Sequence, residues 1–78
     1  MSYGWINDDQ ILVFDGGKTT EQFTLISISQ NTKRPVLQEI NVQSNQRAQF
    51  AMSPDTNSLA LALEKDGVWL IKKSLIEK

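Results

Sequence analysis

The sequence predicts an all-β protein, a six- to seven-stranded antiparallel meander. Two observations lead to this prediction: short apolar runs rich in β-favouring residues, and clusters of turn residues between them. The clearest case is Arg47–Lys73, which reads as three strands separated by two tight turns. The first turn contains Pro54 and the second contains Asp66-Gly67. With 78 residues, we expect one small β domain over residues 1–78.

The first half of the chain contains four predicted strands. They are Tyr3–Ile6, Gln10–Phe14, Gln22–Ser29 and Pro35–Val42. The second is continuously apolar, which is typical of a strand buried on both faces. In the third, Ile26 and Ile28 lie on one face and the alternating serines lie on the other. Because proline cannot donate to a β-ladder, Pro35 predicts that the fourth is an edge strand.

The second half contains three predicted strands. They are Gln49–Met52, Ser58–Leu63 and Val68–Ile71. Leucine and alanine favour a helix in the middle one, but its short length and the flanking turns favour a strand. The tail, Lys72–Lys78, is compatible with a continued strand or a short helix. In the first half, Gly16 and Gly17 are expected to supply the positive φ angles of a hairpin whose loop continues through Glu21.

Composition limits the classes of function. The chain has no Cys and no His, which excludes disulfides and thiolate metal sites and removes the commonest neutral metal ligand. Because a core of this size supplies only about 3–5 kcal/mol, we expect association with another chain or another copy. Eight Lys and Arg against nine Asp and Glu argue against a nucleic-acid partner. No signal peptide or membrane-spanning run is visible, so we expect a cytoplasmic protein without a membrane partner.

No motif in the chain predicts catalysis, a cofactor or a metal. Gly17-Lys18-Thr19 resembles the end of a phosphate-binding loop, but Leu12 stands where that motif needs glycine. The acidic pair Asp8-Asp9 with Asn7 has oxygen ligands for a hard cation, but a capped turn explains these residues better. We therefore expect no enzyme, no catalytic residue, no metal ligand and no cofactor-binding residue.

The two halves of the chain resemble each other. Asn7–Phe14 aligns with Ser53–Ala62 after a two-residue gap, and Glu21–Ile26 aligns with Asp66–Ile71 without one. This defines unit one, residues 3–42, and unit two, residues 47–78. A repeat of about 40–50 residues built from short strands is typical of propeller-type repeats.

Unit two also carries a resemblance to a known family. Phe50-Ala51-Met52-Ser53-Pro54-Asp55, an apolar strand, Asp66-Gly67 and Val68-Trp69-Leu70-Ile71 are similar to the WD-repeat-like blade of β-propellers. The resemblance implies two incomplete blades, about one and three-quarters in all. Thr56 replaces the usual turn glycine, and closed propellers need about four to eight blades. It also implies that the outer strand of unit two is missing or is supplied late by Ser74–Lys78.

These features predict a non-catalytic protein-interaction module. We expect open sheet edges to pair with a partner chain or with a second copy, through main-chain hydrogen bonds. Aromatic side chains near an exposed end are favoured binding anchors, whereas Trp69 is expected to pack within the sheet. The candidate partner-binding residues are Tyr3, Trp5, Val68, Leu70, Lys72 and Leu75.

Two alternatives remain open. The first is a small barrel or sandwich in which Trp5 and Tyr3 line a pocket for a small ligand. The second is a barrel that binds single-stranded nucleic acid through Lys33, Arg34 and Arg47 together with aromatic stacking.

Overall fold

Seven strands and one short helix make up the part of the chain that the structure describes. The computed structural model describes residues 2–16, 22–43 and 45–77. The elements are β1 (Ser2–Trp5), β2 (Gln10–Phe14), β3 (Phe23–Ser27), β4 (Thr32–Val36), β5 (Ala48–Met52), β6 (Ser58–Leu63), β7 (Gly67–Lys72) and α1 (Lys73–Glu77). Their type and number confirm the predicted all-β class.

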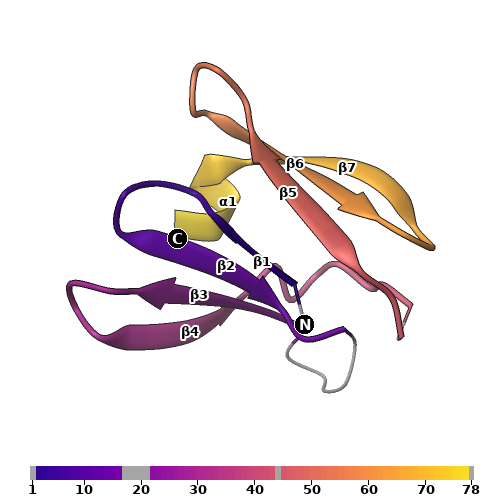
Figure 1. Ribbon diagram of the computed structural model, residues 1–78, viewed down its shortest axis with the longest axis horizontal. Helices are drawn as coiled ribbons and strands as arrows, with labels where there is room; N and C mark the ends of the chain where they lie inside the picture. Colours follow the sequence, from indigo (N-terminus) through magenta and orange to yellow (C-terminus); the bar gives the residue numbers. More distant parts are fainter. Residues whose placement is uncertain (1, 17–21, 44, 78) are drawn as a thin grey trace.

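The strands form two antiparallel sheets, each a simple meander (Figure 1). The first has the order β1-β2-β3-β4 and the second has the order β5-β6-β7. The sheets approach each other at β1 and β5. There Gly4 faces Phe50 so closely that a Cβ atom added to the glycine would lie 2.7 Å from the Phe50 Cβ. The absence of a side chain at Gly4 therefore sets how closely the two sheets pack.

The turns follow the chemistry of their residues. After β1, the Asn7 Oδ1 accepts hydrogen bonds from the backbone N–H groups of Asp9 and Gln10, both at 2.8 Å. Gly67 begins β7 with a φ of 80°, as the predicted Asp-Gly turn requires. Gly16 also has a φ of 80°, in agreement with its predicted role. The predictions for Gly17 and for the loop through Glu21 lie outside the described residues.

The prediction for the fourth strand is wrong in its bounds. We expected Pro35–Val42, but β4 ends at Val36 because Leu37 adopts a φ of 54°, which breaks the extended conformation. The Ile40 N–H then donates to the Leu37 carbonyl at 3.1 Å, so a turn follows. β4 is nevertheless an edge strand of its sheet, as its proline predicted.

The burial predicted for the neighbouring strands is also corrected. β3 ends at Ser27, which lies on the core face, whereas Ile28 follows the strand and is 54 % exposed. The antiparallel register explains this result, because it pairs Phe23 with Phe14 and so orients alternate β3 residues toward the core. Buried Ser27 accepts a hydrogen bond from the Gln10 Nε2 at 3.2 Å. β2 is not buried on both faces, since its odd-numbered residues are only half-buried.

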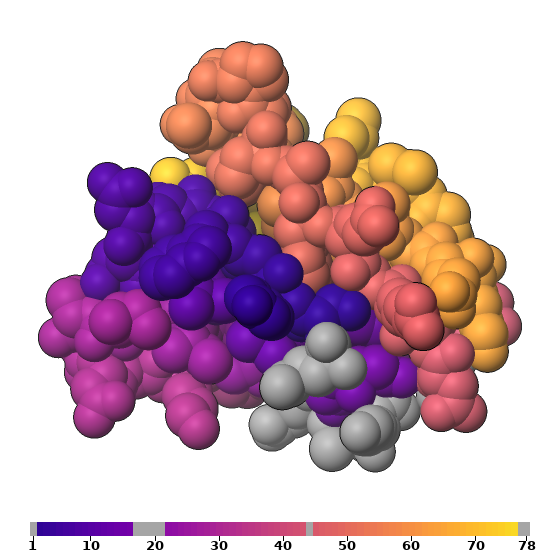
Figure 2. All heavy atoms as spheres, viewed as in Figure 1, coloured from indigo at the N-terminus to yellow at the C-terminus, as the bar shows by residue number. Residues whose placement is uncertain are grey.

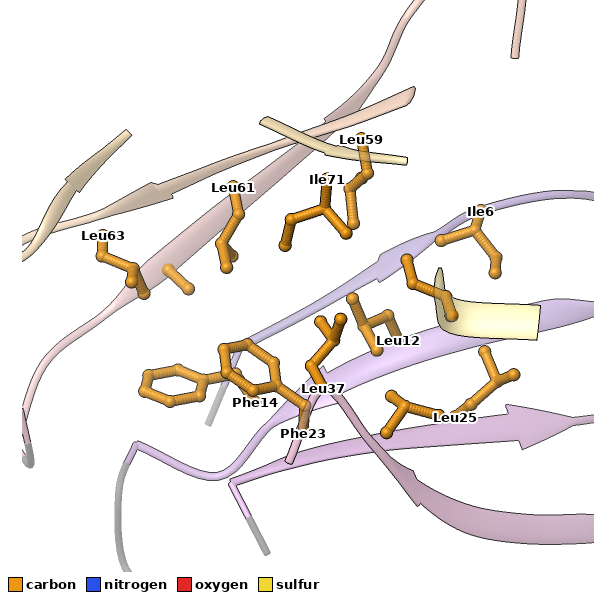
Figure 3. Packing of buried hydrophobic residues seen from close by; sticks show 13 residues of the cluster. Ile6, Leu12, Phe14, Phe23, Leu25, Leu37, Leu59, Leu61, Leu63 and Ile71 are labelled. Atoms are coloured by element: carbon orange, nitrogen blue, oxygen red, sulfur yellow. The ribbon is translucent and has the colours of Figure 1, made fainter. Parts of the chain in front are cut away.

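One hydrophobic core lies between the two sheets (Figure 3). The labelled side chains of the two sheets point toward one another in this space, and the rings of Phe14 and Phe23 stack with centroids 5.0 Å apart. The leucines of β6 are almost fully buried, as their alternation predicted. Among the residues that the structure describes, the buried apolar ones are Ile6, Leu12, Phe14, Phe23, Leu25, Val36, Leu37, Ala48, Leu59, Leu61, Leu63, Ile71 and Ile76.

The tail forms a helix, α1, and not an outer strand for the second sheet. The helix lies between the two sheets in Figure 1 and buries Ile76 completely. The Arg34 Nη2 on β4 donates to the Ile76 carbonyl at 2.7 Å. Residues 73–77 are therefore not an outer strand, and β7 is an edge of its sheet within the described part of the chain.

A polar network joins the connector between the sheets to the β6–β7 turn. Gln46 is buried, and its Nε2 donates to Asp66 and, at 2.7 Å, to the Gln43 carbonyl. Its Oε1 accepts from the Lys65 N–H at 2.8 Å. The Gln43 N–H also donates to the Asp66 carboxylate at 2.9 Å. Hydrogen bonds from the Gln43 backbone and then from the Gln46 side chain lower the pKa of Asp66 below its ordinary value.

This network predicts acid-sensitive stability. Because the folded-state pKa of Asp66 is lowered, its stabilisation is complete at neutral pH and is lost as the pH falls through the acidic range toward that lowered value. We expect Asp66→Asn to lower the urea midpoint at neutral pH, and the difference from the wild type to shrink in acid. Glu39→Gln, at an exposed turn, is the control for loss of one negative charge. A difference that stays constant down to the acid limit would contradict this role.

Candidate interaction surfaces

The outer face of the first sheet carries two exposed aromatic side chains. Tyr3 is 67 % exposed and Trp5 is 54 % exposed. The register places Tyr3 opposite Val13 and Trp5 opposite Ile11, and Ile11 lies opposite Ile26 on β3. Alternate side chains of a strand share a face, so these five residues lie on the side of the sheet that is turned away from the core. We call this set the first outer face: Tyr3, Trp5, Ile11, Val13 and Ile26.

The outer face of the second sheet also carries exposed apolar side chains. Val68 is 71 % exposed and Leu70 is 79 % exposed, and they lie opposite Ala62 and Ala60 respectively. Ala60 in turn lies opposite Ala51 on β5. We call this set the second outer face: Ala51, Ala60, Ala62, Val68 and Leu70.

The predicted partner-binding residues therefore do not form one patch. Tyr3 and Trp5 lie on the first outer face, whereas the register places Lys72 on the same side of its sheet as Val68 and Leu70. The sixth candidate, Leu75, is 42 % exposed on α1. Figure 2 shows the N-terminal strand at the surface, side by side with the chain of β5. All six residues are exposed, but they belong to two sheet faces and one helix.

Sequence reasoning missed most members of the two faces. The alanines of β6 and the isoleucines Ile11 and Ile26 carry no individual signal for binding. Their grouping becomes visible only when the alternation of side chains along each strand is combined with the register between strands. The register then shows that these residues share one face, because the alternate residues face the core. Trp69 lies opposite Leu61, on the core side of its sheet as expected, although 38 % of it remains exposed.

The basic residues of the nucleic-acid alternative are not brought together. Lys33 and Arg34 are successive residues of β4, so their side chains project from opposite faces of the first sheet. The Arg34 guanidinium is engaged by the α1 carbonyl described above. Arg47 immediately precedes β5, in the second sheet.

The acidic cluster near the N-terminus stabilises turns. The Asp9 Oδ1 accepts from the Ser29 N–H at 2.7 Å, and the Asp9 Oδ2 accepts from the Ser29 hydroxyl at 2.9 Å. These bonds join the β1–β2 turn to the β3–β4 turn. No group of three or more potential metal-ligating side chains occurs among the described residues. Gly17-Lys18-Thr19 lies outside the described part of the chain.

Two surface hollows lie away from the exposed aromatics. A hollow of about 470 Å³ is lined by Asn57, Ser58, Lys72, Lys73 and Ser74. A second, of about 300 Å³, is lined by Arg47, Gln49, Ala62, Leu63 and Glu64. Neither hollow contains Tyr3 or Trp5, which were the residues expected to line a ligand pocket.

Comparison with protein families, with curated proteins and with solved structures finds no match to this chain. Within the described residues, no helix has the length and apolar character needed to cross a membrane.

Proposed function

We propose that this chain is a non-catalytic protein-interaction module that associates with another protein chain, in the first instance a copy of itself. The observation that supports this function is the exposure of apolar side chains on the first and the second outer face, with Val68 71 % and Leu70 79 % exposed. Single exposed apolar residues are ordinary, but contiguous apolar faces mark interaction surfaces. Here the registers make each face contiguous.

The charges around these faces favour association. None of the strands β1 to β7 contains an acidic residue, and their basic residues, Lys33, Arg34 and Lys72, lie on β4 and β7, the last strands of the two sheets. An interface core depleted of charge avoids the cost of desolvating unpaired ions. The formal net charge of −1 also leaves little repulsion between copies.

We also propose that the two meanders are incomplete propeller-type blades. The strand order supports this, because β2 and β3 align in sequence with β6 and β7, and β1 and β5 hold the same position in their sheets. Within residues 2–16, 22–43 and 45–77, only the first sheet has a fourth strand. The edge of β7, which pairs with no further strand in these residues, is then a second route for a partner, by strand addition.

Sedimentation velocity over a wide range of protein concentration tests this function. We expect a mass above that of the monomer that rises with concentration, because burial of apolar area drives the association. Leu70→Lys should shift the distribution toward the monomer, whereas Gln38→Lys, at an exposed turn beyond β4, should not. A strict monomer at every concentration would contradict self-association.

A further inference from the structure

The two sheets meet through opposite faces, and their hydrogen bonds show this. In β2, the even-numbered residues face the core and bond to β1, as the 3.0 Å bond from the Ile6 N–H to the Gln10 carbonyl indicates. In β6, the odd-numbered residues face the core and bond to β7, as the 2.9 Å bond from the Lys73 N–H to the Asn57 carbonyl indicates. In the first sheet, the core-facing residues of the middle strand thus form backbone hydrogen bonds with the first strand. In the second sheet, the core-facing residues of the middle strand form them with the third strand.

This difference has a geometric meaning. For a strand of given direction, the face on which a side chain lies fixes the lateral direction of that residue's N–H and C=O groups. Viewed from the core with the middle strand pointing upward, β1 and β7 therefore lie on the same side. The two sheets therefore do not pack through equivalent faces. In terms of strand order, the core-facing side of the first sheet corresponds to the solvent-facing side of the second sheet. We call this arrangement head-to-tail stacking.

The sequence alignment of the two units agrees with this stacking. It aligns Phe23 with Val68 and Leu25 with Leu70. In unit one these positions are 1 % and 2 % exposed because the second sheet covers them, whereas in unit two they are 71 % and 79 % exposed. The second outer face therefore occupies the position that, in unit one, is covered by a following sheet.

The core-facing side of the second sheet, which covers unit one, also has a counterpart on the first sheet. Unit one is covered by a face that includes Leu59, Leu61 and Ile71. The alignment matches these residues with Ile11, Val13 and Ile26. All three belong to the first outer face.

We propose that a second copy docks its first outer face on the second outer face of this chain, repeating between copies the stacking that exists within one. This inference rests on the proposed self-association and adds the surfaces and their order. Small side chains at Ala51, Ala60 and Ala62 leave room for the large rings of Tyr3 and Trp5. Such a contact is heterologous, so each copy uses one face to bind and offers the other.

Mixing two variants tests this arrangement. Trp5→Lys blocks the first outer face and leaves the second intact, whereas Leu70→Lys does the reverse. Each variant alone should self-associate at least about thirtyfold more weakly than the wild type, the loss expected for an interface hot spot. The equimolar mixture should form a heterodimer, because one intact first face meets one intact second face.

Gln38→Lys carries the same change of charge and should associate like the wild type. Far-UV circular dichroism and thermal unfolding should show that all three variants stay folded, since all three replaced side chains are exposed. Wild-type association without a heterodimer in the mixture would refute head-to-tail docking and leave the proposed function standing. A monomeric wild type would refute self-association and the docking inferred from it. Association of Leu70→Lys alone at wild-type strength would indicate contact between two first outer faces and would also refute the inference.

Discussion

Replacing Phe14 by alanine should destabilise the protein by about 3–5 kcal/mol, the usual cost of removing a fully buried phenylalanine. Its side chain is 0 % exposed and stacks on Phe23 at 5.0 Å in the middle of the core. The core of a chain of 78 residues is expected to supply only about 3–5 kcal/mol of net stability. This single substitution therefore removes a large part of the stability, and a substantial unfolded fraction is the expected result.

Urea unfolding followed by circular dichroism measures this loss. Ile28→Ala is the control, because Ile28 is an apolar residue that is 54 % exposed, and its loss should cost no more than about 0.5 kcal/mol. Equal losses of stability at the two positions would show that side-chain packing between the sheets is not the main source of stability.

Adding a side chain at Gly4 should destabilise the protein by about 1–3 kcal/mol for alanine and by more for valine. The cause is the Phe50 Cβ, which would lie 2.7 Å from the new Cβ, so that β1 and β5 must move apart. Valine has a high β-propensity and would stabilise an unobstructed strand. The expected order of stability, glycine above alanine above valine, is thus opposite to the order that propensity predicts.

Thermal unfolding of the three proteins gives this order directly. An increase in stability from glycine to valine would show that the two edge strands are not in close contact. Because the same displacement changes how the sheets stack, the alanine variant should also lose part of its self-association. The Gln38→Lys protein again provides the reference for unchanged association.

The local features of the fold could be predicted from the sequence. The end of β2 follows from an apolar run that stops before Asp15, and the strand β6 follows from alternating leucines between two turns. The turns at Asn7 and Gly67 follow from side-chain capping and from a residue that tolerates positive φ. In each case, the signal lies in neighbouring residues and needs no distant contact.

The errors arose where distant contacts override local pattern. Ile28 belongs to an alternating run, but the pairing of Phe23 with Phe14 orients β3 so that Ser27 faces the core. Leu37 has no local reason to adopt a positive φ, yet its side chain is only 4 % exposed and completes the core beyond β4. The short tail became a helix that buries Ile76 between the sheets.

The candidate surfaces show the same division. Tyr3 and Trp5 were predicted to bind from their type and position near an end of the chain, and the alignment of the two units predicted a repeat. Which side of each sheet faces solvent was decided only by the packing of the two sheets on each other. In this protein both faces of each sheet carry apolar side chains, so burial depends on which face the neighbouring sheet covers. That choice leaves Val68 and Leu70 exposed while it buries their counterparts Phe23 and Leu25.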